Sequence, residues 1–544
     1  MNNQFKSVFT DENTSNIAKL NCIPVTQNTL DDIQFIDKDM VLKHLKKIRS
    51  NKAEGPDEVY ARILREAEVE LSLPLSIIFA ASLSQSLIPL DWKRANVVPI
   101  FKKGDKSKVE NYRPVSLTSL VCKLLESIIK DAVVNFLEAH NLIKATQHGF
   151  RKAHSCLTNL LSFLDFATEQ FDKGQQTDVA YLDFSKAFDK VPHQRLLIKL
   201  KQHGIRGRIV KWIESWLSGR QQRVVLNGSK SHWLDVISGV PQGSVLGPVL
   251  FIIFINDIDN GIDSNVLKFA DDLKIFRKVE TTNDYKLLQD DLDKIVKWSE
   301  TWQMKFNFGK CKIMHIGRKN NSDSYFMDSN NLDIIEREKD LGVIINSRLD
   351  SSEQTVEARK KGLRMLGAIN RNVGYKSKEV VKKLYTAYVR PHLEYCVQAW
   401  CPMHEKDCWL LERVQKRATK MINGFGSLSY EERLKQLDMF SLRYRRLRGD
   451  LIEVFKFVQD PEERYLSDLF TFNRNDTVRG HQYKIILNHS RTRLRQSFFC
   501  RRVVKHWNQL PNEIVSSSSL GIFKTKLDNH FRELGTAYQF SRET

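Results

Sequence analysis

Three aspartates follow directly after short apolar segments of the chain. Asp183 comes after residues 179–182, and the adjacent pair Asp271 and Asp272 comes after residues 267–270. Uncompensated carboxylates are costly beside apolar strands, so a cation is the expected partner. If the two segments are neighbouring strands, the carboxylates form the hard-oxygen site that Mg²⁺ prefers, completed by waters and substrate phosphates. Two such ions can activate a hydroxyl and neutralise a leaving pyrophosphate, so the pattern indicates phosphoryl transfer on nucleotides.

Further side chains that suit this chemistry occur before and after the aspartates. A single Asp–Asp pair is more often a solvated turn than a metal site, so these companions carry the interpretation. Residues 238–248 contain glycines, which allow close backbone approach to a ligand, and Gln242, which can hydrogen-bond a base, a sugar or a phosphate. Arg113 can hold a phosphate with two hydrogen bonds. Lys310 places a cation where a released pyrophosphate could take a proton.

The hydrophobic pattern predicts the elements that must position these residues. Residues 95–101 are expected to form a strand that returns after a turn at 103–105. Residues 185–188 are expected to be a short helical connection after Asp183. Beyond residue 346 the pattern becomes helical and basic. Helices are expected at 117–137, 246–255, 356–372, 378–388, 409–422 and 523–531.

The composition favours a polyanionic partner. The chain has 85 Lys and Arg against 65 Asp and Glu, a net charge of +20 and an isoelectric point near 9.4. Its eight cysteines include no Cys-x-x-Cys pair, and no signal peptide is recognised, which indicates a reducing compartment. The longest apolar stretch, around residues 249–255, is too short to cross a bilayer, so no membrane partner is expected.

Basic side chains interleaved with apolar anchors concentrate in the C-terminal part of the chain. Those expected to contact a nucleic-acid backbone are Arg413, Lys416, Arg417, Lys420, Arg443, Arg445 and Arg446. The alternative for any one of them is a solvated helix face. Binding through such cations weakens as the salt concentration rises.

A cluster of potential zinc ligands lies within the same part of the chain. Its members are His392, Cys396, Cys401, His404 and Cys408. These side chain types can hold Zn²⁺ tetrahedrally, but their spacing fits no common zinc motif. A helical region with buried thiols is therefore the preferred interpretation.

Several segments occur in the order of one known family. The chain resembles the reverse transcriptases of non-LTR (LINE-type) retrotransposons, most closely the jockey-type clades, over about residues 40–535. The matching segments are 52–57 (KAEGPD), 112–117 (YRPVSL), 149–151 (GFR), 182–189 (LDFSKAFD), 239–244 (GVPQGS), 269–272 (FADD) and 341–343 (LGV). Residues 390–395 (RPHLEY) and 411–420 (LERVQKRATK) resemble the C-terminal part of that family.

The resemblance implies a catalytic triad of Asp183, Asp271 and Asp272. Asp183 and Asp271 would bind two Mg²⁺ ions, for which Mn²⁺ is a possible substitute, and the carbonyl of Phe184 would be a backbone ligand. Asp272 would be the third carboxylate.

The resemblance also implies a nucleotide pocket. Phe188 would stack under the sugar and exclude a 2′-hydroxyl, and Gln242 and Gly243 would shape the pocket for nucleotide and template. The alternative for Phe188 is an ordinary core position.

Cations are expected around the triphosphate of the nucleotide. Arg113 would hold the triphosphate, with Lys102 or Lys103 as a second cation, and Lys310 would be the general acid. The alternatives are that Arg113 pairs with an acid of the fingers and that Lys310 is a solvated surface cation.

The implied fold is α+β, a right-hand polymerase fold whose palm is an antiparallel sheet with helices. The expected regions are a loosely ordered polar leader (1–36), an N-terminal extension with fingers (37–146), the palm (147–346), a helical thumb (347–430) and a basic C-terminal region (431–544). Glu54 and Glu58 stand where the family pattern has Pro and Gly, so that early turn is expected to differ.

The implied activity is RNA-directed DNA synthesis. The expected partners are an RNA template, a DNA primer or target DNA and dNTPs, in the nucleus and cytoplasm. The endonuclease that such elements usually carry upstream is not expected in this chain. Two alternatives stay open: a catalytically inactive nucleic-acid-binding relic or domesticated derivative, and an intron maturase, which residues 411–415 disfavour.

Overall fold

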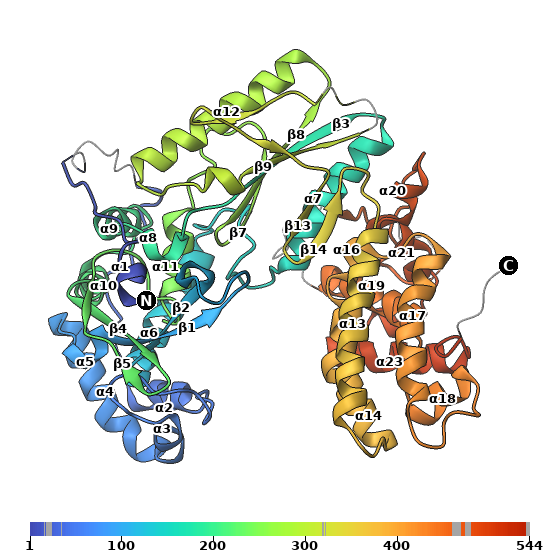
Figure 1. The fold of residues 1–544 in the computed structure, drawn as a ribbon, viewed down its shortest axis with the longest axis horizontal. Coiled ribbons are helices and arrows are strands. Elements are labelled where there is room, and N and C mark those ends of the chain that lie inside the picture. Colours follow the sequence, from blue (N-terminus) through green and yellow to red (C-terminus); the bar gives the residue numbers. More distant parts are fainter. Residues whose placement is uncertain are drawn as a thin grey trace.

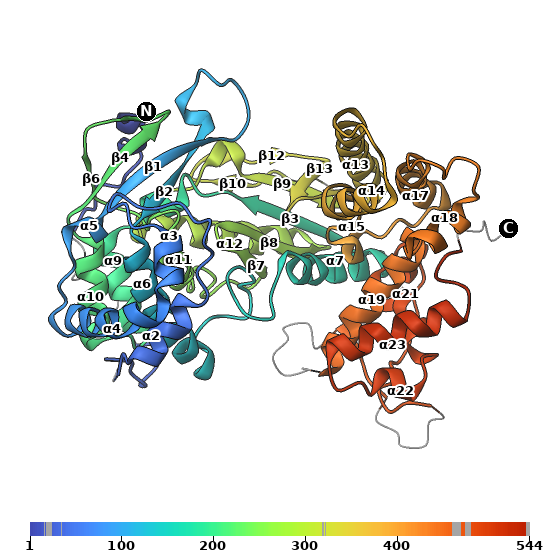
Figure 2. The same ribbon diagram turned by 90° about the horizontal axis from the view of Figure 1, so that it is seen from below.

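The computed structural model describes residues 1–15, 17, 24–33, 35–317, 320, 322–459, 469–473 and 480–539. Two lobes are joined by a central sheet, which gives the molecule the shape of an arch (Figure 1). The N-terminus lies in one lobe, and the C-terminal helices form the other (Figures 1 and 2). The predicted α+β class is confirmed.

The central sheet has five strands in the order β12-β9-β3-β8-β7. Their bounds are β3 (Gln176–Leu182), β7 (Asn265–Phe269), β8 (Asp272–Val279), β9 (Lys312–Ile316) and β12 (Asp333–Ile334). The pairs of β3 with β8 and β9, and of β7 with β8, are antiparallel, whereas β12 joins β9 in parallel. The central sheet is thus antiparallel except at its β12 edge.

The two faces of this sheet belong to two different hydrophobic cores. Successive strand residues point to opposite faces, and along β3 Val179 belongs to one core while Ala180 and Leu182 belong to the other. The helix α12 (Thr282–Thr301) contributes to the core of Ala180, and α7 (Cys156–Asp172) to the core of Val179. A single strand thus links both lobes of the arch.

The first lobe contains a second sheet, built from segments far apart in the sequence. Strand β1 (Arg94–Phe101) pairs antiparallel with β2 (Tyr112–Thr118), as predicted, and in parallel with β4 (Arg220–Leu226). The short strands β5 (Ser229–Lys230) and β6 (Leu234–Val236) also pair with β4. Strands β4 to β6, which lie within the range expected for the palm, thus join the sheet of β1 and β2.

A group of helices lies in the same lobe as this second sheet (Figure 2). They are α2 (Lys38–Leu45), α3 (Ala61–Glu66), α4 (Glu68–Gln85), α5 (Leu90–Lys93), α6 (Leu120–Ala139), α8 (Ala187–Lys190), α9 (His193–Gln202), α10 (Gly207–Leu217) and α11 (Gly247–Phe254). The helices predicted at 117–137 and 246–255 are confirmed as α6 and α11.

The start of the chain is not a loose leader in the part that the structure describes. Helix α1 (Asn2–Lys6) buries Phe5 against Val97 and Val224. Glu12 forms an ion pair with the buried Arg195 at 3.0 Å. The polar composition misled the prediction because these few contacts are made with distant segments.

The described regular elements of the second lobe are helices, apart from an isolated bridge between Phe472 and Ile485. Its helices are α13 (Ser352–Asn372), α14 (Lys378–Leu384), the π-helix Tyr385–Val389, α15 (Arg390–Glu394), α16 (Val397–Trp400), α17 (Glu405–Lys420), α18 (Tyr430–Leu437), α19 (Leu442–Gln459), α20 (Arg493–Ser497), α21 (Phe499–Asn508), α22 (Asn512–Val515) and α23 (Leu520–Glu533). The hairpin of β13 (Arg337–Asp340) and β14 (Val343–Asn346) precedes α13.

The expected thumb and C-terminal region share one hydrophobic core, which also includes α7 of the palm. The ion pair between Arg495 and Asp165, at 2.8 Å, ties α20 to α7. No helix among the described residues combines the length and the apolar character needed to cross a bilayer.

Candidate active site

The first aspartate of the predicted triad lies at the end of the strand that is central to the sheet. Asp183 follows β3 directly, and the last pair of the β3–β8 ladder joins Leu182 to Leu273. One residue further in this register, Asp183 stands opposite Asp272, the first residue of β8. Opposed residues of an antiparallel pair have Cα atoms about 5 Å apart and side chains on the same face. The structure therefore brings these two carboxylates together.

Asp271 lies in the two-residue turn of the β7–β8 hairpin. Phe269 pairs with Asp272 at the end of the ladder, which leaves Ala270 and Asp271 as the turn. Ala270 has a left-handed φ of +55°, a conformation that is costly for a residue with a Cβ atom. The turn sets Asp271 beside Asp272, so the third carboxylate of the triad joins the other two.

Neighbouring residues hold this turn in place. The buried Gln147 accepts hydrogen bonds through Oε1 from the N–H of Gly149 (2.8 Å) and of Ala270 (3.0 Å). A Cβ atom on Gly149 would lie 2.5 Å from the backbone nitrogen of Ala270. Gly149 was part of a motif in the sequence, but the role of Gln147 was missed, because a lone glutamine carries no recognisable pattern.

The carboxylates repel one another. Burial raises the pKa of Asp271, and the charge of Asp183 raises it further. Asp272 stays exposed, yet loss of hydration and the charges of Asp271, Asp340 and Asp183 raise its pKa to about 6. A bound cation would relieve this repulsion, so the electrostatics of the site favour cation binding.

Lys310 is the side chain that pairs with the triad. Its Nζ lies 2.7 Å from Asp183 Oδ2. The backbone supports this contact, because Asn307 N–H donates to Asp183 O at 2.7 Å and Ser185 N–H donates to Lys305 O at 2.9 Å. The Lys310 side chain is 63% exposed, so this ion pair lies at the surface of the site.

More cations face the carboxylates from the β1–β2 hairpin. Arg113 on β2 is exposed and forms no ion pair with any residue that the structure describes. Burial lowers the pKa of Lys102, as do the nearby charges of Arg113, Lys186 and Lys310. The same two residues, Arg113 and Lys102, lower the pKa of Asp271 in opposition to its burial. Lys102 and Arg113 are therefore close enough to Asp271 for their charges to affect its pKa.

Part of this site is an open depression of about 380 Å³. Asp183 and Asp272 line it together with Lys103, Lys310 and Asp340. The buried Lys274 on β8 forms an ion pair with Asp340 on β13. This pair was missed by the sequence analysis because its members are far apart in the chain.

The predicted nucleotide pocket lies next to the aspartates. The half-buried ring of Phe188 stacks on Phe251 with centroids 4.6 Å apart. Gln242 Nε2 donates to Asp189 Oδ1 at 3.1 Å. Gly243 has a φ of +126°, and a Cβ atom there would lie 2.4 Å from Ser116 O. Only glycine fits at Gly243, so the backbone of this loop lies directly against β2.

No preformed metal centre of protein ligands is present in the described ranges. There, no group of three or more His, Cys, Asp or Glu side chains is arranged to hold a metal ion. One oxygen of Asp183 is instead engaged by Lys310. The five candidate zinc ligands from His392 to Cys408 likewise form no such group, and Cys396, Cys401 and Cys408 are free thiols.

The C-terminal cations divide into two sets. Arg413, Lys416, Arg417 and Lys420 are exposed on α17. On α19, by contrast, Arg443 and Arg445 form ion pairs with Glu405 and Glu394, and Arg446 is buried. Two arginines of the second set therefore have acidic partners within the protein, with Arg443 still 36% exposed, and the third is buried, which the alternation of cations and apolar residues did not reveal.

The turn at Glu58 does not show the change that the sequence predicted. Its φ is +54°, in the left-handed region that favours glycine. The glutamate therefore adopts the strained conformation itself, rather than moving the backbone to a conformation that suits it.

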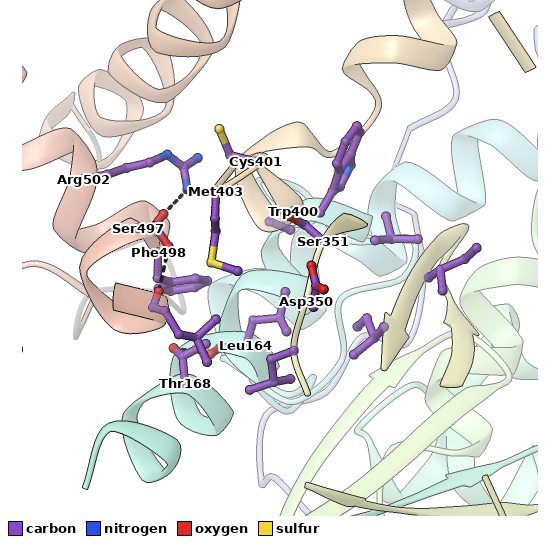
Figure 3. A pocket seen from close by; sticks show the side chains of 16 residues that line it. Leu164, Thr168, Asp350, Ser351, Trp400, Cys401, Met403, Ser497, Phe498 and Arg502 are labelled. Atoms are coloured by element: carbon purple, nitrogen blue, oxygen red, sulfur yellow. Dashed lines mark hydrogen bonds between the residues drawn. The ribbon is translucent and has the colours of Figure 1, made fainter. Parts of the chain in front are cut away.

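A second pocket lies where the palm meets the helical lobe (Figure 3). It is small, about 50 Å³, and its lining includes Leu164 and Thr168 of α7, Trp400 of α16 and Arg502 of α21. Arg502 donates a hydrogen bond to Ser497 O at 3.0 Å across the pocket wall (Figure 3). None of the predicted catalytic or nucleotide-binding residues lines it.

The part of the chain that contains this site is similar to known proteins. Residues 100–369 fit a family model described as reverse transcriptase (RNA-dependent DNA polymerase). An RNA-directed DNA polymerase from mobile element jockey of Drosophila funebris is 29% identical over 398 residues, which are 70% of this chain and 42% of that protein. A probable RNA-directed DNA polymerase from transposon X-element of Drosophila melanogaster is 25% identical over 389 residues, 69% of this chain and 42% of that protein.

The chain spans less than half the length of these relatives. The predicted triad and nucleotide pocket all fall within the family match, whereas the cations of α17 and α19 lie beyond it.

Proposed function

We propose that the chain is a reverse transcriptase of the jockey-like non-LTR type, which extends a DNA 3′-hydroxyl by copying an RNA template. One observation carries the proposal. Asp183 and Asp272 oppose each other at the end of the β3–β8 ladder, with Asp271 in the adjoining turn and cations facing them.

The family generally uses divalent metal ions, and the donor set of this site suits them. Asp183, Asp271 and Asp272 supply hard oxygen atoms, and burial and neighbouring carboxylate charges raise the pKa values of Asp271 and Asp272. We propose that Mg²⁺, with Mn²⁺ as a substitute, is held by Asp183, Asp271 and the Phe184 carbonyl, with Asp272 beside them. When bound, the ions would lower the barrier to attack of the 3′-hydroxyl on the α-phosphate.

The remaining roles follow from the charges and shapes of the chain's own groups. Arg113, with Lys102 or Lys103, would bind the triphosphate. Lys310 would pass from Asp183 to the leaving pyrophosphate and donate a proton to it. Phe188, fixed by its stacking on Phe251, would leave no room for a 2′-hydroxyl.

The proposed partners are an RNA template, a DNA primer or target DNA, and dNTPs. The exposed cations of α17 would contact the phosphates of the duplex backbone, which position a protein on a nucleic acid without reading its sequence. A nuclear and cytoplasmic location is also proposed, because the proposed RNA and DNA partners occur there.

Primer extension tests the proposal. Purified protein would be given an RNA template annealed to a DNA primer, dNTPs and Mg²⁺, beside Asp183→Asn and Asp271→Asn. We expect each substitution to lower the extension rate by about a thousandfold or more, with duplex affinity within about threefold of wild type. Asp263→Asn, at an exposed aspartate just before β7, is the matched control and should extend normally.

Two outcomes would contradict the proposal. Equal extension by the wild type and both site variants would exclude these carboxylates from the chemistry. A folded wild type that binds the duplex but adds no nucleotide would establish the alternative, a nucleic-acid-binding relic.

A further inference from the structure

The loop of residues 238–243 is held by backbone contacts on two sides. Val240 N–H donates to Phe188 O at 2.7 Å, and Ser116 N–H donates to Gln242 O at 2.7 Å. These contacts connect the turn after β3 to strand β2. They fix the backbone of Gln242, but they leave open which way its side-chain amide faces.

The carboxylate of Asp189 decides the direction of this amide. Gln242 Nε2 lies 3.1 Å from Asp189 Oδ1. An ionised carboxylate can only accept hydrogen bonds, so the nitrogen of the amide must face Asp189 and Oε1 must face away from it. The second oxygen, Asp189 Oδ2, is buried and has no hydrogen-bond partner among the described residues. Gln242 is therefore the side-chain donor that engages Asp189.

The surroundings of Asp189 connect it to the nucleotide pocket. Burial raises its pKa, while Lys186, the bond from Gln242, Lys102 and Arg113 act in the opposite direction. Lys102 and Arg113 are two of the cations proposed to bind the triphosphate. Asp189 therefore lies near Lys102 and Arg113, which are proposed to bind the triphosphate, and its carboxylate contacts the loop of residues 238–243 through Gln242.

We propose that Asp189 is a positioning residue that makes Gln242 present its amide oxygen to a hydrogen-bond donor of the bound nucleotide. The inference rests on the proposed function, because it names the group that this pocket recognises. A phosphate only accepts hydrogen bonds at its ionised oxygens, so this orientation excludes phosphate as the partner of Oε1. A donor on the base or the sugar remains, and loss of Asp189 would let the amide rotate and present its NH₂ group instead.

A reciprocal exchange tests the contact and its effect together. Gln242→Glu alone would place two carboxylates against each other. Adding Asp189→Asn would restore a hydrogen bond in the reverse direction, from Asn to Glu, with a carboxylate oxygen still facing away. The readouts are KM for dNTP and kcat in primer extension, and the melting temperature of each variant.

We expect Asp189→Asn to raise KM for dNTP by about three- to thirtyfold while kcat changes by less than about threefold. Gln242→Glu should raise KM more, and the double variant should recover at least about threefold of that loss. Asp291→Asn is the matched control, because this buried aspartate of α12 accepts from the N–H groups of Asp263 (3.1 Å) and Ser264 (2.8 Å), and its described hydrogen bonds involve neither Asp189 nor Gln242. It should lower the melting temperature and leave KM unchanged.

The opposite results are also distinct. A double variant whose KM equals the product of the two single effects would overturn the inference, as would an unchanged KM in Asp189→Asn. A wild type that extends no primer would overturn the proposed function, and with it the nucleotide as the partner of Oε1. In that case the melting temperatures of the wild type, the two single variants and the double variant would still decide the Asp189–Gln242 contact. The contact is refuted if the changes in melting temperature of the two single variants add up to the change in the double variant.

Discussion

At the scale of single residues, Asp272 shows most directly how the site is charged. It is exposed, yet its pKa is raised to about 6 by lost hydration and by three neighbouring carboxylates. An isolated aspartate would be ionised well below that pH. Asp272 therefore takes up a proton in a pH range where enzymes are commonly assayed.

We expect the extension rate to fall as the pH is lowered through about 6, because a protonated Asp272 no longer attracts a cation. The rate should be full above this range, since the raised pKa shifts protonation upward. Protons and Mg²⁺ compete for the same oxygens, so more Mg²⁺ should move the acid limb to lower pH. Rates measured from pH 5 to 8 at two Mg²⁺ concentrations check this. An acid limb that does not respond to Mg²⁺ would assign the titration to another group.

Glu58 offers a second prediction at this scale. A left-handed conformation costs a residue with a Cβ atom about 1–2 kcal/mol, and Glu58 has a φ of +54°. Its side chain is 71% exposed and lies 3.9 Å from Lys230, so loss of that ion pair costs little. We expect Glu58→Gly to raise the free energy of unfolding by about 1 kcal/mol, measured by urea denaturation.

Glu54→Gly is the control for this substitution. Glu54 is not among the residues with positive φ. Glycine there only adds freedom to the unfolded chain, so the free energy of unfolding should fall by up to about 1 kcal/mol. Equal effects of the two substitutions would show that strain at Glu58 is not the cause.

At the scale of elements, the β7–β8 hairpin depends on the segment before α7. Thr146 O accepts from Lys268 N–H at 2.8 Å, and His148 N–H donates to Lys268 O at 2.9 Å. Gln147, between them, binds the turn itself through its side chain. The position of Asp271 is thus set by an edge contact to β7 as well as by the β7–β8 ladder.

We expect Gln147→Met to lower the free energy of unfolding by about 2 kcal/mol or more, since two buried N–H groups lose their acceptor. It should also slow extension more than about tenfold at temperatures where the variant is fully folded, because the turn is misplaced. Gln170→Met, at a buried glutamine of α7, is the matched control. If both variants lose the same free energy of unfolding and the same extension rate, Gln147 only fills space in the core and does not position the turn.

Elements with a strong local pattern could be predicted from the sequence. The helices at 356–372 and 523–531 are confirmed as α13 and α23, since their apolar spacing is visible within one segment. The three aspartates were chosen from the sequence because they follow apolar segments. Their grouping was inferred only on the assumption that the two strands are neighbours.

What could not be predicted depends on contacts between distant segments. Strand β4 reads like any short strand, and nothing near it shows that β1 is its parallel partner. Arg446 has the same local pattern as an exposed helix cation, but α17 and its neighbours bury it. Asp189 likewise stood in the segment 182–189 of the sequence, but nothing there showed its contact with Gln242.

At the scale of the whole molecule, cations serve either the interior or the surface. Arg445 is tied to Glu394 by two hydrogen bonds, whereas Arg413 and Arg417 stand exposed on α17. The first kind holds α19 to α15, and the second kind is available to a nucleic acid.

We expect the double substitution Arg413→Gln/Arg417→Gln to weaken binding of an RNA–DNA duplex and to lower the slope of log affinity against log salt by about 1–2. Its melting temperature should stay unchanged. Arg445→Gln, the contrasting variant, should melt at a lower temperature and keep the salt slope. Fluorescence anisotropy at several salt concentrations and thermal unfolding check both. An unchanged slope in the double variant would place the duplex elsewhere.

The parallel pairing of β1 with β4 also affects how the chain leaves the ribosome. Strand β1 ends at Phe101, and β4 begins only at Arg220. At 5–20 residues per second, the nascent chain waits on the order of ten seconds before β4 is made. During that time one edge of β1 is unpaired and open to neighbouring nascent chains on the same message. Messages that are cut or terminated before the codon for Arg220 would therefore yield products prone to aggregate, and slow translation of this interval would increase the demand for chaperones.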